Sequence, residues 1–124
     1  MSQRLKVRDL RPLLIQRGEL LPVTAFAERM GWSRQALSKA LAARRVFFID
    51  HQGEHFYPAF YADPTLERRH LYAVTRRLGD LPGGSKWAFF TRPKASLSGA
   101  TPLLALQRGY LAAVLGAAAG FAER

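Results

Sequence analysis

The sequence contains no cysteine and few acidic residues. The absence of cysteine excludes disulfides, thiolate metal sites and a cysteine nucleophile. Only 9 of the 124 residues are Asp or Glu, against 19 Lys and Arg, so the formal net charge is +10. No apolar run approaches the roughly 20 residues needed to span a bilayer. The N-terminus lacks the apolar core of a signal peptide, and we therefore expect a cytoplasmic protein.

The sequence motifs of common enzyme chemistries are also missing. There is no phosphate loop, nucleophile elbow or HExxH motif, and no pair of acids suited to a hydrolase. The histidines are His51, His55 and His70, and they lack a full set of metal ligands. Residues 83–86 (GGSK) lack the strand that precedes a phosphate-binding loop, so a linker is the better interpretation. We predict no enzymatic activity, no metal and no cofactor.

The positive charge is concentrated at the two ends of the chain. Residues 1–45 carry a net charge of +7, residues 46–84 of −1 and residues 85–124 of +4. A basic N-terminal third favours a polyanionic partner, most simply nucleic acid. The alternative is a solvated basic face that only confers solubility.

Length and composition fit one domain, or two very small ones that share a core. Residue periodicity predicts a mainly α-helical fold with a small β-hairpin. Helices are expected at 5–17, 25–30, 34–43, 64–78, 86–91, 102–108 and 110–119, with Thr24, Ser33, Asp63, Ser85 and Thr101 as N-caps. The hairpin is expected at 45–57 with its turn at Gly53, and residues 20–22 as an apolar connection. We divide the chain into a DNA-binding region with the hairpin (1–62), a connecting helix (63–81) and a C-terminal helical region (85–124), with 81–84 as a linker.

Residues 23–42 (VTAFAERMGWSRQALSKALA) have the pattern of a helix-turn-helix DNA-binding motif. The turn of such a motif needs a residue that tolerates a left-handed backbone, and a small residue one turn earlier lets the helices approach. Gly31 and Ala27 meet these two demands. The apolar positions around the turn and along the second helix are Phe26, Met30, Trp32 and Leu37. An ordinary helical hairpin, which shares only the apolar periodicity, is the alternative.

The outer face of the second helix carries side chains suited to DNA. Arg34 can pair with guanine and Gln35 with adenine in the major groove, while serine and lysine suit phosphate contacts. The predicted DNA-binding residues are Ser33, Arg34, Gln35, Ser38, Lys39, Arg44 and Arg45. No acidic residue occurs between Ser33 and Ile49, so this run contains no charge that repels phosphate.

The hairpin follows the second helix directly, which is the order of a winged helix-turn-helix. Its tip, residues 51–54 (HQGE), is not basic, so we favour a structural role over contact with DNA. An isolated hairpin is marginally stable. A sheet joined across two subunits of a homodimer is therefore a reasonable hypothesis.

The C-terminal region predicts three short helices, and the last is apolar on most faces, so it must be buried or bound to a partner. The pattern of aromatic, apolar, glycine and Thr-Pro positions in this region is formed by Trp87, Phe90, Leu97, Gly99, Thr101, Pro102, Leu103, Leu106, Gly109, Val114 and Ala118. In this pattern the region resembles the toxin-binding domain of the Xre/MbcA/ParS-type antitoxins.

The resemblance implies an antitoxin that represses its own operon through a helix-turn-helix and neutralises a RES-domain toxin, a class that consumes NAD. The expected partner-binding residues are Trp87, Phe90, Leu97, Thr101, Pro102, Leu103, Leu106, Tyr110 and Val114. The family's DNA-binding domain is usually all-helical, whereas a hairpin is expected here. Two alternatives stay open: a stand-alone dimeric transcriptional regulator without a toxin, and a basic protein-interaction module with no role on DNA.

Overall fold

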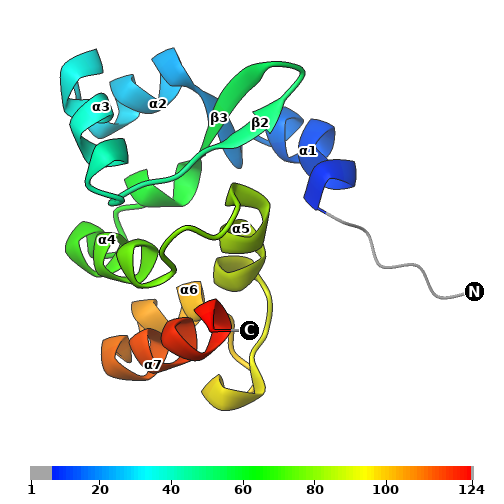
Figure 1. The fold of residues 1–124 in the computed structure, drawn as a ribbon, viewed down its shortest axis with the longest axis vertical. Helices are drawn as coiled ribbons and strands as arrows, with labels where there is room; N and C mark the ends of the chain where they lie inside the picture. Colours follow the sequence, from blue (N-terminus) through cyan, green and yellow to red (C-terminus); the bar gives the residue numbers. More distant parts are fainter. Residues whose placement is uncertain (1–6, 124) are drawn as a thin grey trace, which may run out of the picture.

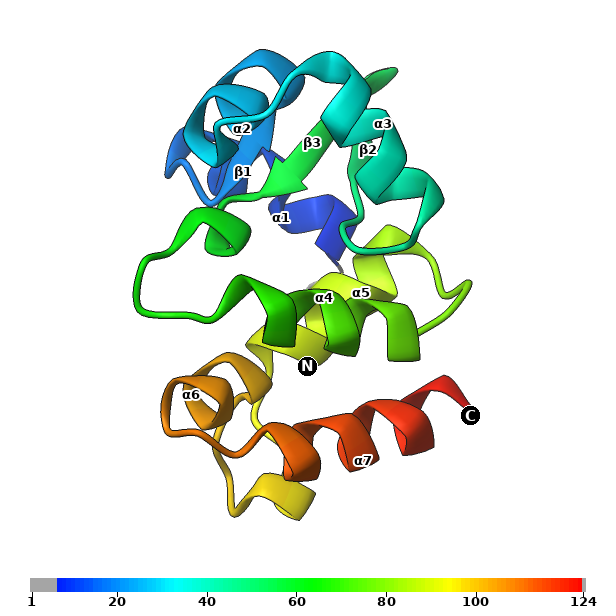
Figure 2. The same cartoon turned by 90° about the vertical axis from the view of Figure 1, so that its left-hand side faces the viewer.

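A computed structural model describes residues 7–123, which form seven α-helices and a small antiparallel sheet (Figure 1). The predicted fold class, mainly α with a small β-hairpin, is confirmed. The helices are α1 (Val7–Gln16), α2 (Val23–Met30), α3 (Arg34–Ala42), α4 (Arg68–Arg77), α5 (Gly83–Thr91), α6 (Pro102–Gln107) and α7 (Leu111–Ala122). The strands are β1 (Leu20–Pro22), β2 (Ile49–His51) and β3 (Glu54–Pro58), and 3₁₀ helices occupy Ala59–Ala62 and Ala95–Leu97. Figure 2 shows three tiers, with the sheet and α1–α3 above α4 and α5, and α6 and α7 at the bottom.

The predicted hairpin is present, although its first strand begins at Ile49 and not at residue 45. Its turn has a left-handed backbone at Gln52 (φ 53°) and Gly53 (φ 80°). A third strand was not expected. β1 pairs antiparallel with β3, with Pro22 opposite Phe56, so the interpretation of residues 20–22 as a connection without regular structure was wrong. Three residues are too few to show the alternation that marks a strand. Pro22 is tolerated because β1 lies at the edge of the sheet, where its missing N–H breaks no ladder.

Two of the expected N-caps are confirmed: the Ser33 hydroxyl accepts a hydrogen bond from the Ala36 N–H, and the Thr101 hydroxyl from the Leu104 N–H, both at 3.1 Å. Thr24 is not a cap, because α2 already begins at Val23. The expected start of the first helix at residue 5 lies outside the described residues.

Two other helix starts were predicted wrongly. The Asp63 carboxylate accepts a hydrogen bond from the Thr65 N–H at 2.8 Å, which closes a tight turn, and α4 begins only at Arg68. α5 begins at Gly83, so the predicted linker supplies its first residues and Ser85 does not cap it. Pro82 precedes the helix in an extended conformation (ψ 152°) and so defines where the helix starts.

Aromatic side chains join the sheet to the C-terminal helices in one continuous core. Phe47, which precedes β2, stacks on Phe90 of α5 with 6.2 Å between ring centroids. Phe60 lies 4.8 Å from Phe90 and 5.8 Å from Trp87 by the same measure. Aromatic pairs at such distances add to the free energy of area burial. The N-terminal region with the sheet and the C-terminal helices therefore hold each other in position.

A fully buried hydrogen bond joins the hydroxyls of Tyr61 and Thr75, and the Thr75 hydroxyl also donates to the Leu71 carbonyl at 2.9 Å. Burial raises the pKa of Tyr61 far above its ordinary value, so its hydroxyl stays protonated and donates to Thr75. A Thr75→Val substitution leaves this hydroxyl buried without an acceptor. We expect a loss of about 2 kcal/mol in the free energy of unfolding, measured by chemical denaturation.

A Tyr61→Phe/Thr75→Val double variant tests the cause of that loss. Removing both hydroxyls leaves no orphaned donor, so the double variant should be more stable than Thr75→Val alone. A double variant less stable than the single one would show that packing, and not the hydrogen bond, accounts for the loss.

Within residues 7–123, no single helix is long and apolar enough to cross a membrane. The segments Ala95–Gln107 and Leu111–Ala122 together have sufficient length and apolar character, and they bend by 119° at the break between them.

Candidate nucleic-acid interface

The turn between α2 and α3 is built on Gly31, which has a left-handed backbone (φ 73°). The N–H of Gly31 bonds to the Glu28 carbonyl at 3.1 Å and that of Trp32 to the Ala27 carbonyl at 2.9 Å, so both terminal carbonyls of α2 have partners. The helices and the glycine turn of the predicted motif are present. Their use in DNA binding stays a prediction.

The inner faces of α2 and α3 hold this pair of helices on the sheet. Phe26 and Met30 of α2 and Leu37 and Ala40 of α3 are buried. The Phe26 ring stacks on Tyr57 of β3, with centroids 4.8 Å apart and planes 10° from parallel. The remaining motif positions, Ala27 and Trp32, are half-buried. These contacts therefore hold α3 in a fixed position on the sheet, and the side chains of its outer face point away from the core.

Four of the predicted DNA-binding residues lie together on the outer face of α3. Arg34, Gln35, Ser38 and Lys39 are all exposed, and i to i+4 spacing places Arg34 beside Ser38 and Gln35 beside Lys39. Ser33 is also exposed, but its hydroxyl already caps α3. The outer face of α3 thus offers two long polar side chains, a hydroxyl and an ammonium group.

The two arginines after α3 have different surroundings. Arg44 takes a left-handed backbone (φ 57°) and forms an ion pair with Asp80, in the segment between α4 and α5. Arg45 is half-buried, near Tyr72 of α4. The structure therefore separates Arg44, which is paired within the chain, from the four residues on the outer face of α3.

Sequence reasoning did not single out the residues of α4 that border this turn. Arg68 donates a hydrogen bond to the Met30 carbonyl at 3.1 Å, and the Tyr72 ring lies 6.3 Å from the Trp32 ring. α2, α3 and α4 lie on the side of the molecule that faces the viewer in Figure 2. No local pattern links Arg68 to the turn, because α2 and α4 are far apart along the chain.

Lys86 of α5 is a buried cation behind the end of α3. Its side chain is 8% exposed, and its Nζ lies 6.0 Å from the centroid of the Phe47 ring. Burial lowers the pKa of Lys86, and the charge of Arg44 lowers it further, while the Asp80 carboxylate acts in the opposite direction. Lys86 is therefore easier to deprotonate in the folded chain than in the unfolded chain.

This difference predicts a pH dependence of stability. Between the lowered pKa in the folded chain and the ordinary value of 10.5, the unfolded chain binds more protons, so stability rises with pH through that window. Chemical denaturation at a series of pH values up to 10.5 should show this rise in the wild type and a smaller rise in Lys86→Met. Lys39→Met, at an exposed site, is the matched control and should keep the rise. An equal rise in all three proteins would contradict the assignment to Lys86.

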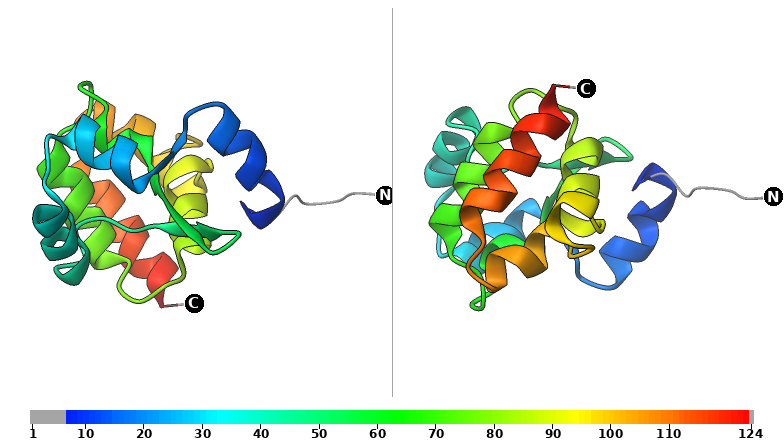
Figure 3. Two further views of the ribbon diagram at one scale, coloured as in Figure 1. Left: turned by 90° about the horizontal axis from the view of Figure 1, so that it is seen from above. Right: turned by 90° about the horizontal axis from the view of Figure 1, so that it is seen from below.

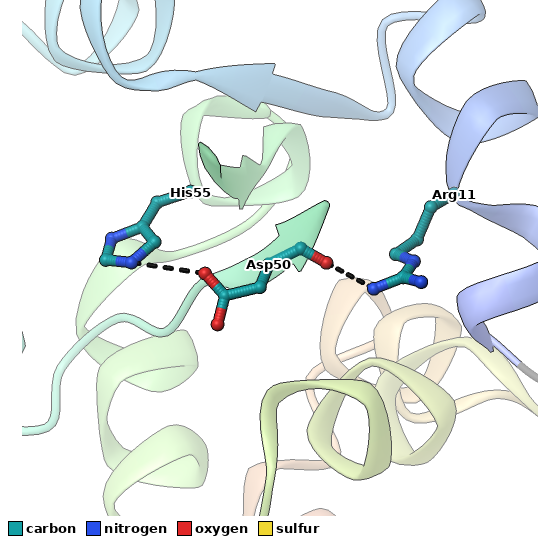
Figure 4. Close-up of polar contacts among 3 residues, drawn as sticks. All are labelled: Arg11, Asp50 and His55. Carbon is teal, nitrogen blue, oxygen red and sulfur yellow. Dashed lines mark hydrogen bonds and ion pairs between the residues drawn. The ribbon is translucent and has the colours of Figure 1, made fainter. Parts of the chain in front are cut away.

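The hairpin histidines contact neighbours on the sheet surface. His55 Nε2 lies 3.2 Å from the Asp50 carboxylate and its ring stacks on Phe48, while Arg11 of α1 donates to the Asp50 carbonyl (Figure 4). Within residues 7–123, no group of three or more His, Asp or Glu side chains is placed to hold a metal ion.

Most of the predicted partner-binding residues lie in the core of the C-terminal helices. The buried ones are Trp87, Phe90, Leu97, Pro102, Leu106 and Val114. Thr101 and Leu103 are half-buried, and Tyr110 is 59% exposed. Tyr110 lies at the rim of an open hollow of about 480 Å³ that Arg108 and Ser98 also line. A partner protein could therefore contact Tyr110 directly. The buried residues would affect its binding only by maintaining the shape of the surface.

Comparisons of the chain with protein-family models, with curated proteins and with solved structures found no match.

Proposed function

We propose that this protein is a sequence-specific DNA-binding protein that acts in the cytoplasm as an antitoxin-like repressor of its own operon. The observation that carries the proposal is the outer face of α3, with Arg34 and Gln35 exposed near its start and Ser38 and Lys39 one turn later. Arginine and glutamine make the bidentate contacts that distinguish guanine and adenine in the major groove. We expect a homodimer that binds a near-palindromic operator, with half-sites about one turn of DNA apart. The proposal involves binding alone, with no catalysis and no cofactor.

Selection of binding sites from a random duplex DNA pool tests the sequence specificity. The expected result is an enriched motif, with a logarithm of the affinity that falls linearly with the logarithm of the salt concentration. Equal binding to every duplex would overturn sequence-specific reading. No binding even at low salt would favour the alternative of a basic protein-interaction module.

A toxin as a second partner is favoured by the exposed apolar surface of the C-terminal helices. Tyr110, which is 59% exposed, lines the hollow together with Arg108, and Leu104 of α6 is 37% exposed. Exposed apolar groups beside a concave surface are typical of protein-binding sites. We propose a RES-domain toxin as the protein bound there, with Tyr110 as an anchor.

Co-expression with the product of the adjacent gene tests this partner. Copurification and relief of toxicity, both weakened by Tyr110→Ala, are expected. If the two proteins neither copurify nor neutralise each other, the toxin proposal fails and a stand-alone dimeric regulator is the remaining interpretation.

A further inference from the structure

Arg68, the first residue of α4, is held against the turn that precedes α3. Its Nη1 donates to the Met30 carbonyl at 3.1 Å, and its guanidinium also hydrogen-bonds the Tyr72 side chain. Tyr72 in turn lies against Trp32, with 6.3 Å between ring centroids. A guanidinium has five N–H donors in a fixed planar fork. Two contacts within the chain therefore fix the position of Arg68 and leave further donors for a ligand.

Arg45 brings a second guanidinium to the same place. It follows α3 and is half-buried, and its backbone N–H bonds to the Ala40 carbonyl at 2.9 Å. Burial raises the pKa of Tyr72, while the charges of Arg68 and Arg45 both lower it, because both cations lie close to the phenol. The charges of two arginines from different elements thus act on one tyrosine side chain, which Arg68 also contacts directly.

Among residues 7–123, neither of these two cations has an ion-pair partner. The ion pairs among residues 7–123 join Arg17 to Glu19, Arg44 to Asp80, His55 to Asp50 and Arg69 to Glu67. Arg45 and Arg68 are half-buried, so water screens their mutual repulsion less than on an open surface. A bound anion would remove that repulsion and accept hydrogen bonds from both guanidiniums.

We propose that Arg45, Arg68 and Tyr72 form a binding site for a phosphate of the DNA backbone, beside the helix that reads the bases. This proposal rests on the proposed function. Arginine forks match the geometry of phosphate oxygens, and phosphate contacts fix the register of a protein on the duplex. α4 lies on the same side of the molecule as α3 (Figure 2), so one duplex can meet both helices. α4 is thereby a second DNA-contacting element, which no sequence motif marks.

The salt dependence of binding to the selected operator tests the site. Each phosphate contact contributes about 0.9 to the slope of log affinity against log salt. Arg68→Gln and Arg45→Gln should each lower the slope by about one and weaken binding to all duplexes by similar factors. Arg68→Lys, which keeps the charge, should retain the slope. The matched control is Arg69→Gln, because Arg69 is 84% exposed and pairs with Glu67.

The outcomes separate this proposal from the proposed function. If the wild type binds its operator and both glutamine variants keep its slope, the phosphate site is wrong while DNA binding stands. If the wild type does not bind DNA, the proposed function fails and the phosphate site fails with it. Arg68 also bonds the Met30 carbonyl, so Arg45→Gln measures the same effect without the loss of that contact. A lower slope for Arg69→Gln as well would mean a general charge effect and would overturn the site.

Discussion

An Arg34→Ala variant is expected to bind the operator roughly 5- to 150-fold more weakly than the wild type, a loss of about 1–3 kcal/mol. Arg34 is exposed at the first position of α3, on the outer face of a helix whose inner face is anchored by Leu37 and Ala40. Removing the guanidinium would remove the proposed bidentate contact with guanine. Discrimination at one base pair should therefore fall together with affinity.

The control for this experiment removes the same charge from the opposite end of the molecule. Arg17 follows α1, and Figure 3 shows α1 (blue) and α3 (teal) on opposite sides in the view from above. The Arg17 side chain is 62% exposed and forms a loose ion pair with Glu19 at 4.0 Å. Arg17→Ala should leave operator affinity nearly unchanged. Equal losses of operator affinity in both variants would show that Arg34 contributes only through its positive charge.

Gln35→Ala distinguishes base reading from phosphate contact on the same face. Gln35 carries no charge, so its loss should relax specificity at one base pair, with adenine preferred, without altering the salt slope. Fluorescence anisotropy with operators substituted one base pair at a time measures this. If Arg34→Ala and Gln35→Ala both leave affinity and specificity unchanged, α3 is not the recognition helix.

Gly83→Ala is expected to lower the free energy of unfolding by about 3 kcal/mol, and the melting temperature by roughly 10 °C. A Cβ at Gly83 would lie 2.0 Å from the Phe48 carbonyl oxygen and 3.1 Å from its carbonyl carbon. Both atoms belong to the backbone, so no side-chain rotation relieves the clash. Either the start of α5 or the segment before β2 must move, and both carry aromatic residues of the core.

Gly116→Ala is the matched control for this substitution. Gly116 lies inside α7, and a Cβ there would meet no atom within 4 Å. Alanine favours helix over glycine by about 0.5–1 kcal/mol, so this variant should be slightly more stable than the wild type. Thermal unfolding followed by circular dichroism measures both variants. If Gly83→Ala has the same melting temperature as the wild type, the close approach of α5 to Phe48 is not needed for stability.

The sequence by itself determined the elements that local chemistry specifies. Gly31 and the apolar residues around it predict two short helices and their turn, and Ser33 and Thr101 predict helix starts that their hydroxyls do cap. The hairpin at 49–58 is found where β-branched and aromatic residues flank Gly53. Each of these inferences depends on residues a few positions apart, so it needs no information about distant parts of the chain.

Only the tertiary structure decided what depends on distant partners. β1 is a strand because β3 offers it a pairing edge, and Gly83 must be glycine because Phe48 comes close to it. Arg68 reaches the Met30 carbonyl, and Tyr72 lies against Trp32, because α4 packs beside the turn before α3. The uneven positive charge favours a polyanionic partner, but the sequence alone does not show on which face of the molecule the charged side chains lie. One side of α3 is buried and the other is exposed, so the charged side chains of this helix lie on one surface. Packing decides this, because it determines which side chains remain free to bind.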